Sequence, residues 1–186
     1  MKNNISQALR LSLVLLIILA VVYPILIFGF AQFSPNKGKG FTVKNGDKTY
    51  YENIGQSFKE DKYFQSRPSA VEYNAAGSGG SNKGATNPEY LKTVSARIDT
   101  LMMKNQGLKR EEIPADLITA SGSGLDPDIS LQAAKIQVKR IAAVRKISEE
   151  KILSLVEKHV EKPLFGMFGP EKINVLKLNI DLDTLN

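Results

Sequence analysis

Cysteine is absent from the 186-residue sequence, and histidine occurs once, as His159. Without thiolates and with one imidazole, the chain cannot assemble a zinc site from the usual cysteine and histidine ligands. A serine nucleophile such as Ser121 or Ser123 would need His159 as its base, and His159 lies among charged neighbours on a predicted helix. The absence of cysteine fits either side of a membrane and indicates no redox compartment.

Charged residues are missing from one long stretch, 11-LSLVLLIILAVVYPILIFGFAQF-33. At about 1.5 Å per residue, a helix of this length covers roughly 34 Å, which is enough to cross the hydrocarbon core of a bilayer. A signal peptide would have a shorter apolar core and a small-residue cleavage site. The sequence therefore predicts a transmembrane helix over 11–33 after a short tail over 1–10. A lone span without ionisable residues cannot enclose a polar pore, so ions would have to be carried by another subunit.

Positive charges flank this segment almost evenly, with Lys2 and Arg10 before it and Lys37, Lys39 and Lys44 after it. The positive-inside rule therefore gives no clear orientation. Whichever way the helix points, the remaining residues lie together on one side of the membrane.

The rest of the chain predicts a linker followed by one domain of the α+β class. Glycine, lysine and asparagine dominate 34–49, which is typical of a juxtamembrane linker, and a compact domain is expected over 50–186. Periodicity and capping residues predict three helices and two strands. The expected elements are helices 88–106 (N-cap Asn87), 131–146 (N-cap Ser130) and 148–162 (N-cap Ser148), and strands 116–120 and 174–183.

Two glycine- and serine-rich stretches, 75–87 and 119–130, are the most unusual parts of the domain. In 119–130, Pro127 occupies the third glycine position of a dinucleotide fingerprint, and neither stretch ends in the Gly-Lys-Ser/Thr of a Walker A loop. Asp126 and Asp128 lack the spacing of an EF-hand, so no metal site is expected. Asp followed by Pro is typical of a turn, which favours a turn-and-cap role for 119–130.

The helix expected over 131–146 is basic, with no acidic residue between Asp128 and Glu149. Its basic residues are Lys135, Lys139, Arg140, Arg145 and Lys146. Such a run is usually a solvated face. Nucleic acid is not expected as a partner because interleaved stacking aromatics are missing. Anionic lipid head groups or an acidic partner surface are the favoured functional interpretations.

A series of short motifs runs from the N-terminal anchor to the C-terminus. It comprises 63-YFQSRPSA-70, 73-YN-74, 78-SGGSN-82, 87-NP-88, 114-PADLITASGSGLDPDIS-130, 137-QVKRIAAVR-145 and 174-NVLKLN-179. In this order the motifs closely resemble the C subunit of the Kdp-type potassium-transporting ATPase. Two departures are Leu131, where the family commonly has proline, and 83-KG-84, where it commonly has Leu-Gly.

The resemblance implies a non-catalytic accessory subunit of a high-affinity, ATP-driven potassium importer. It implies a plasma-membrane protein with a cytoplasmic N-terminus, one span and an extracytoplasmic domain. The implied partners are the P-type ATPase subunit, the channel-like potassium-binding subunit, a further small membrane subunit and the lipid bilayer. The family is described as a catalytic chaperone that raises the ATP affinity of the ATPase subunit. No cofactor is expected to bind tightly, and ATP is expected only as part of the complex.

The polar loops are the candidate site, either as a surface that faces a partner or as residues that support one another. The candidates are Arg67, Ser69, Asn74, Ser78, Gly79, Gly80, Ser81, Asn82, Ser121, Gly122, Ser123, Gly124 and Asp126. No catalytic and no metal-binding residue is expected among them. Two alternatives from other classes remain, a membrane-anchored hydrolase using Ser123 and His159, and a nucleotide-binding module using the Gly/Ser loops.

Overall fold

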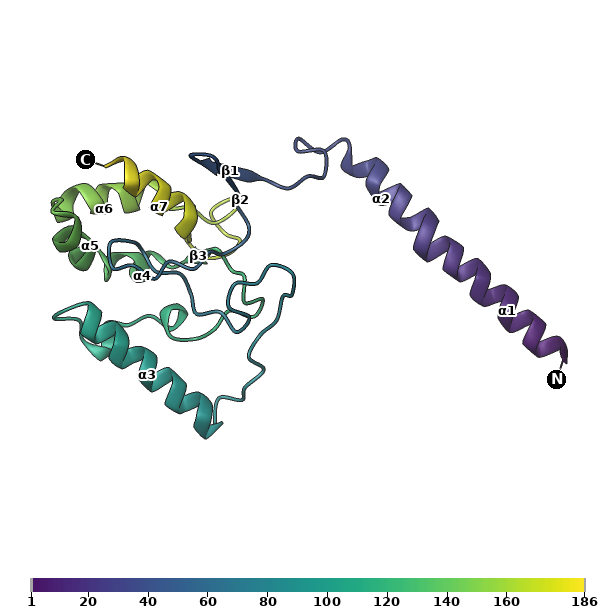
Figure 1. Cartoon of the computed structure of the whole chain (residues 1–186), viewed down its shortest axis with the longest axis horizontal. Helices are drawn as coiled ribbons and strands as arrows, with labels where there is room; N and C mark the ends of the chain where they lie inside the picture. The colour runs from purple at the N-terminus through teal and green to yellow at the C-terminus, as the bar shows by residue number, and fades with distance from the viewer. Residues whose placement is uncertain (1, 186) are drawn as a thin grey trace. The chain divides into compact units, whose positions relative to one another are not determined.

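The computed structural model describes residues 2–185 and divides into two units, with the division after Phe41. The first unit is one long helical segment, and the second is a domain of helices and two small sheets. The prediction of one N-terminal apolar helix followed by a compact α+β domain is confirmed (Figure 1).

The helical segment of the first unit is built from three consecutive parts. These are α1 (Lys2–Ile17), a π-helical turn (Ile18–Val22) and α2 (Tyr23–Ala31). The stretch Asn4–Ala31 is long and apolar enough to cross a membrane. Pro24 has no backbone N–H to donate, and the π-helical turn lies directly before the α2 turn that contains it. The proline is therefore accommodated by a local change of helical pitch.

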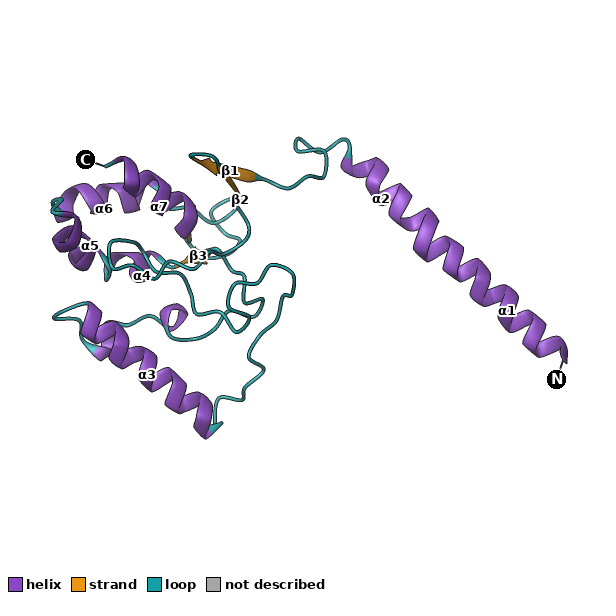
Figure 2. Cartoon of the chain, in the orientation of Figure 1, coloured by secondary structure: helices purple, strands orange, loops and turns teal. Residues whose placement is uncertain are grey.

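The second unit begins with a short hairpin of β1 (Thr42–Asn45) and β2 (Lys48–Tyr51), which pair antiparallel. This hairpin lies across the predicted boundary between the linker over 34–49 and the domain over 50–186. After β2, residues 52–87 contain neither helix nor strand, as the long loops of Figure 2 show.

The helices of the domain follow this loop region. A second two-stranded sheet pairs the segment before α4 with the segment before α7. The helices are α3 (Pro88–Lys104), α4 (Leu131–Lys135), α5 (Val138–Arg145), α6 (Glu149–Lys158) and α7 (Val175–Thr184). Short 3₁₀ turns cover Arg110–Glu112 and Ala115–Leu117. The sheet pairs β3 (Asp128–Ile129) antiparallel with β4 (Ile173–Asn174).

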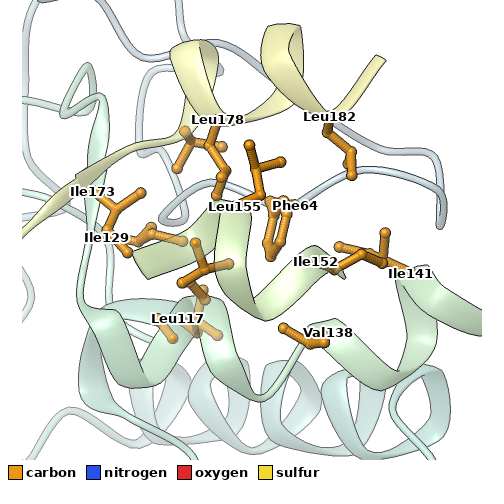
Figure 3. Packing of buried hydrophobic residues seen from close by; sticks show 14 of the residues in the cluster. Phe64, Leu117, Ile129, Val138, Ile141, Ile152, Leu155, Ile173, Leu178 and Leu182 are labelled. Atoms are coloured by element: carbon orange, nitrogen blue, oxygen red, sulfur yellow. The ribbon is translucent and has the colours of Figure 1, made fainter. Parts of the chain in front are cut away.

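The core lies between the loop segment around Phe64 and helices α4 to α7. The ring of Phe64 is fully buried and lies beside Leu155 in Figure 3, with Leu178 and Leu182 of α7 nearby. Phe64, Leu178 and Leu182 are fully buried, and Leu155 is 8% exposed. A loop residue, rather than a helical one, is therefore at the centre of the packing.

Helix starts are where the sequence predicts the structure best. Asn87, Ser130 and Ser148 each accept a hydrogen bond from a backbone N–H in the first turn of the following helix, as predicted. These short polar side chains satisfy amides that have no partner inside the helix. The helices α3 and α6 have the predicted N-termini.

The strand predicted over 174–183 is wrong, because this segment forms α7. Its alternating apolar residues also fit a helix, since Val175, Leu178 and Leu182 recur at helical spacing and are buried. Asn174 caps the helix by accepting a hydrogen bond from the N–H of Lys177, at 3.1 Å. The apolar positions alone allow either a strand or a helix. The cap residue directly before them favours the helix.

Two further predictions are wrong in detail. Instead of the strand expected over 116–120, the chain forms the 3₁₀ turn Ala115–Leu117, and the N–H and hydroxyl of Thr119, just after it, both donate to the carbonyl of Ala115. The single helix expected over 131–146 is broken into α4 and α5 around Gln137. The side-chain amide of Gln137 donates to the carbonyl of Ala133, the acceptor its own backbone N–H would use in a continuous helix.

Candidate functional site

The two glycine-rich stretches lie against each other through direct hydrogen bonds. The N–H of Gly79 and the hydroxyl of Ser78 both donate to the carbonyl of Ser123, at 2.8 and 3.0 Å. We call residues 67–82 and 121–126 the paired loops. Segments that are about 45 residues apart in the chain therefore form one unit of structure.

Ser69 is the residue that connects most backbone groups in the paired loops. Its hydroxyl donates to the carbonyl of Gly124 at 2.6 Å and accepts from the N–H groups of Val71 and Tyr73. The hydroxyl of Tyr73 in turn donates to the carbonyl of Arg67. The side chains thus replace a strand ladder in a segment that has no regular structure.

Glycine is required where the backbones of the paired loops approach most closely. Gly124 has a φ of 68°, and a Cβ there would lie 2.6 Å from a methyl carbon of Val71 and 2.7 Å from the carbonyl oxygen of Gly79. A Cβ on Gly80 would lie 3.0 Å from the carbonyl oxygen of Gly122. These contacts explain the glycines by packing, with no phosphate needed.

Arg67 and Asp126 form an ion pair at one end of the paired loops, with the guanidinium Nη1 2.8 Å from a carboxylate oxygen. The other carboxylate oxygen of Asp126 accepts from the N–H of Asp128 at 3.0 Å, which is the turn expected from Asp followed by Pro. The Nε of Arg67 is buried and has no hydrogen-bond partner among the described residues. Since both side chains are a quarter to a third exposed, the pair contributes modestly to stability.

Most of the predicted site residues meet in the paired loops. Arg67, Ser69, Ser78, Gly79, Gly80, Ser121, Gly122, Ser123, Gly124 and Asp126 contact the opposite loop or lie at the close approach. The remaining three lie elsewhere on the same segment. Asn74 accepts from the N–H of Ala76 in its own turn, Asn82 has a φ of 51°, and Ser81 lines a cavity of about 400 Å³ with Lys83 and Arg97.

Several backbone amides of the paired loops are already used inside the fold. The N–H groups of Ser121, Gly124 and Leu125 donate to the Pro68 carbonyl, the Ser121 carbonyl and the Ser123 hydroxyl, respectively. A phosphate-cradling loop instead directs several backbone amides at its ligand. This arrangement favours a structural or docking role over phosphate binding.

Three aspartates line a second cavity, of about 290 Å³, but each has a protein partner. Asp116 accepts from the N–H and hydroxyl of Ser130, and Asp128 pairs with Lys172 at 2.6 Å. Asp126 is held by Arg67. Among residues 2–185, no cluster of three or more histidine or acidic side chains has the geometry to hold a metal ion.

His159, the only candidate base, lies at the end of α6 and contacts α7. Its Nε2 is 2.9 Å from a carboxylate oxygen of Asp181. The hydroxyl of Ser123, the proposed nucleophile, accepts from the N–H of Leu125 in a tight turn. Each group of the hydrolase alternative therefore has a separate structural partner, and no nucleophile–base pair is formed.

A buried polar network that the sequence analysis missed holds the segment around Phe64. The side-chain amide of Asn179 accepts from the N–H of Phe64 at 2.8 Å and donates to its carbonyl at 2.9 Å. Gln137 holds the next residue, Gln65, in the same way, at 2.8 and 3.4 Å. Both side chains are fully or almost fully buried. They act as side-chain substitutes for a neighbouring strand.

Arg140 is the most connected member of this network and is only 7% exposed. Its guanidinium donates to the carbonyls of Asp61 and Tyr63, to Asn105 at 3.1 Å and to Gln137 at 2.8 Å. Burial lowers the pKa of Arg140, while the neighbouring carboxylate of Asp61 raises it. The guanidinium suits this position because it offers five N–H donors in a fixed plane.

The basic run of the sequence is therefore not one solvated face. Arg140 is buried, and Arg145 donates to the carbonyl of Lys62 and to the carboxylate of Asp183, at 2.8 and 2.6 Å. Its guanidinium also lies over the ring of Tyr63. The interpretation of all five residues as a lipid- or partner-binding face is corrected for these two arginines. The burial of Arg140, near the start of α5, can be recognised only once its tertiary neighbours are known.

Comparison with known proteins gives matches over nearly the whole chain. Residues 5–184 match the family model described as KdpC, the c chain of the K⁺-transporting ATPase. A "Potassium-transporting ATPase KdpC subunit" of Flavobacterium psychrophilum is 55% identical over 184 residues, covering 98% of this chain and 99% of that protein. Proteins of the same name are 52% identical in Flavobacterium johnsoniae, over 98% of this chain and 99% of the relative, and 44% identical in Geobacter metallireducens, over 98% of both.

Proposed function

The chain belongs to the KdpC family of K⁺-transporting ATPase subunits, and we propose that it is a non-catalytic accessory subunit of a high-affinity, ATP-driven potassium importer. It supports assembly of the complex and raises the ATP affinity or turnover of the P-type ATPase subunit. Its partners are that ATPase subunit and the channel-like potassium-binding subunit, with a further small membrane subunit. The observation that carries the proposal is the family match over nearly the whole chain, including the N-terminal helix.

Three features of the described residues suit an accessory role. The apolar helix contains no acidic, basic or histidine residue after Arg10, so it offers no polar path for potassium. The hydroxyl of Ser123, the ring of His159 and several backbone amides of the glycine-rich loops have internal partners. Potassium binding and ATP hydrolysis are therefore assigned to the other subunits of the complex.

The paired loops present the surface that we assign to partner docking. Their inner groups hold the two segments together, while Ser81 and, two residues beyond the first loop, Gly84 are exposed. Loops held on a scaffold are common binding elements, and exposed polar side chains are typical of the rim of an interface. The proposal separates a structural set of residues, bonded between the loops, from an exposed set available to a partner.

Adding bulk to the exposed set tests this surface. The variants Ser81→Arg and Gly84→Arg are expected to leave the unfolding midpoint unchanged, since a Cβ on Gly84 meets no atom within 4 Å. They should reduce recovery of the complex in affinity purification by about tenfold, because a clash worth about 1.4 kcal/mol at an interface changes affinity by that factor. Met103→Arg, at an 81% exposed site on α3, is the matched control. Equal recovery for all three variants would reject the paired loops as the docking surface.

We assign the domain to the extracytoplasmic side. A domain there cannot touch cytoplasmic ATP, so its effect on the ATPase subunit must pass through the membrane subunits as a coupling free energy. The proposal includes no tightly bound cofactor in this chain.

Labelling on intact cells tests the orientation. Because the chain has no cysteine, Lys83→Cys introduces a single thiol, at an exposed loop position where the lysine forms a loose ion pair with Glu89, at 3.7 Å. We expect this thiol to react with a membrane-impermeant maleimide on intact cells. Reaction only after lysis would place the domain in the cytoplasm and restore direct contact with ATP as an explanation. The cysteine-free parent chain controls for background labelling.

A further inference from the structure

The loop between α6 and β4 carries a concentrated apolar surface. Leu164, Phe165, Met167 and Phe168 are 64%, 82%, 76% and 64% exposed. We call residues 164–168 the apolar tip. Elsewhere in the second unit, exposed bulky apolar residues are scattered or, like Met102 and Met103, adjacent in pairs. A cluster of this kind marks a surface that is covered in the working protein.

The backbone of the apolar tip is largely hydrogen-bonded within the turn. Leu164 and Phe168 exchange both backbone hydrogen bonds, each at 3.0 Å. The N–H of Gly166 donates to Pro163 and that of Met167 to Leu164, at 2.9 and 3.2 Å. Backbone groups that enter an apolar medium must be satisfied internally. A closed turn of this kind can meet lipid at lower cost than an open loop.

The most exposed side chain of the turn belongs to a residue with a left-handed backbone. Phe165 has a φ of 54°, which is rare for an aromatic residue, and it remains 82% exposed. Strain of this kind persists only where the surrounding structure holds it. Here the fold holds a phenyl ring in solvent, which stabilises nothing within the isolated domain.

The charges around the apolar tip cancel. No charged residue lies between Pro163 and Pro170, and the flanking pairs 161-EK-162 and 171-EK-172 have no net charge. A surface that binds an acidic or basic partner would carry a charge of one sign. The tip instead suits the acyl boundary of a bilayer, with its charged flanks at the level of the head groups.

The chain's own anchor brings a bilayer within reach. Residues 32–41 connect the membrane-length helix to the domain, and ten residues span at most about 36 Å. Such a short tether gives any second contact of the domain with the same bilayer a high effective concentration. A weakly apolar surface can therefore bind lipid without strong affinity of its own.

We propose that the apolar tip inserts into the interfacial layer of the membrane that holds the N-terminal helix, as a second and reversible membrane contact. The contact restricts rotation of the domain on its tether and so fixes which of its faces is turned to the membrane subunits. Zwitterionic lipid is sufficient, because the flanking charges sum to zero.

A single tryptophan reports on this contact. The chain contains no tryptophan, so Phe165→Trp introduces a unique fluorophore at an exposed site. The full chain is reconstituted in phosphatidylcholine vesicles, with or without bromine atoms near the head-group end of the acyl chains. We expect a blue-shifted emission and about twofold or stronger quenching by the brominated lipid, as for a side chain held at the acyl boundary. Met103→Trp is the matched control and should be quenched little.

Two results would overturn the proposal. In the first, Phe165→Trp emits at the wavelength of a hydrated indole and is quenched no more than Met103→Trp. In the second, its emission shifts to the blue only after the other subunits are added, still without quenching by brominated lipid, which would assign the tip to a protein surface. Adding Phe168→Ser to Phe165→Trp should weaken the quenching, because it removes one of the inserting side chains.

Discussion

Replacing Arg140 with methionine is expected to lower the free energy of unfolding of the domain by about 3–5 kcal/mol, as for removal of one partner from a buried charged network. The change removes all the donors that hold the carbonyls of Asp61 and Tyr63. It also removes the donor to the side-chain oxygen of Asn105 and one of the two donors to that of Gln137, which keeps only the N–H of Gln65. Buried acceptors without partners are costly, because they lose water and gain nothing. Urea unfolding of the full chain in mild detergent, followed by circular dichroism, measures the effect.

The matched control for Arg140 is its neighbour Lys139, which is exposed on the same helix. Lys139→Met changes the same charge and should shift the unfolding free energy by no more than about 0.5 kcal/mol, as is usual for surface substitutions. Equal small effects of the two variants would contradict the structural role assigned to the buried guanidinium. In that case the basic run would be better explained as a binding face.

The second large effect is expected at Gly124, where alanine should cost about 2–4 kcal/mol of stability, since a left-handed residue acquires a side chain in a closed space. The added Cβ would meet both Val71 and the carbonyl oxygen of Gly79, which belongs to the opposite loop. To make room, the paired loops must separate, and the hydrogen bond from Ser69 to the Gly124 carbonyl is strained with them. The same unfolding experiment gives the loss, and recovery of the complex should fall in parallel.

Gly77→Ala controls for the loss of a glycine in the same loop region. A Cβ at Gly77 meets nothing within 4 Å, and its φ is not positive. Alanine there should be neutral or slightly stabilising, because it lowers the entropy of the unfolded chain. If Gly124→Ala behaves like Gly77→Ala, the close approach of the two loops is not what keeps them together.

Local signals predicted the parts of the fold that depend on local chemistry. Asn87, Ser130 and Ser148 mark helix starts because a cap bonds to amides two or three residues ahead, within reach of sequence reasoning. The C-terminal segment was misassigned because its apolar residues fit both a period of 2 and a period of 3.6. The cap Asn174 favours the helix, and the packing against Phe64, more than 100 residues away, shows which face is buried.

The candidate site divides in the same way. The residue types of the paired loops indicated turns and recognition, and the structure brings most of them together. The sequence analysis did not identify the network of Gln137, Arg140 and Asn179. These side chains bond to backbone groups of a distant segment, and every residue has such groups whatever its type. The motif series nevertheless contained them all, within 63-YFQSRPSA-70, 137-QVKRIAAVR-145 and 174-NVLKLN-179. Residues of these three motifs therefore donate and accept hydrogen bonds within a single buried network.

Two polar systems thus shape the domain, the buried network around Phe64 and the paired loops. The first stabilises a long segment without regular structure, and the second holds the exposed edge that we assign to docking. Among the described residues, no group of three or more histidine or acidic side chains has the geometry to hold a metal ion, and Ser123 and His159 have separate hydrogen-bond partners. The chain also carries one helix that is long and apolar enough to cross a membrane, as a membrane subunit requires.

The most direct test of this account is affinity purification of the full chain from its native membranes in mild detergent. The account predicts recovery of a large P-type ATPase subunit and a polytopic potassium-binding subunit in proportion to the tagged chain, with potassium-stimulated ATPase activity. Recovery of the chain alone, under conditions in which those two subunits remain associated with each other, would contradict its assignment as a subunit of the working complex.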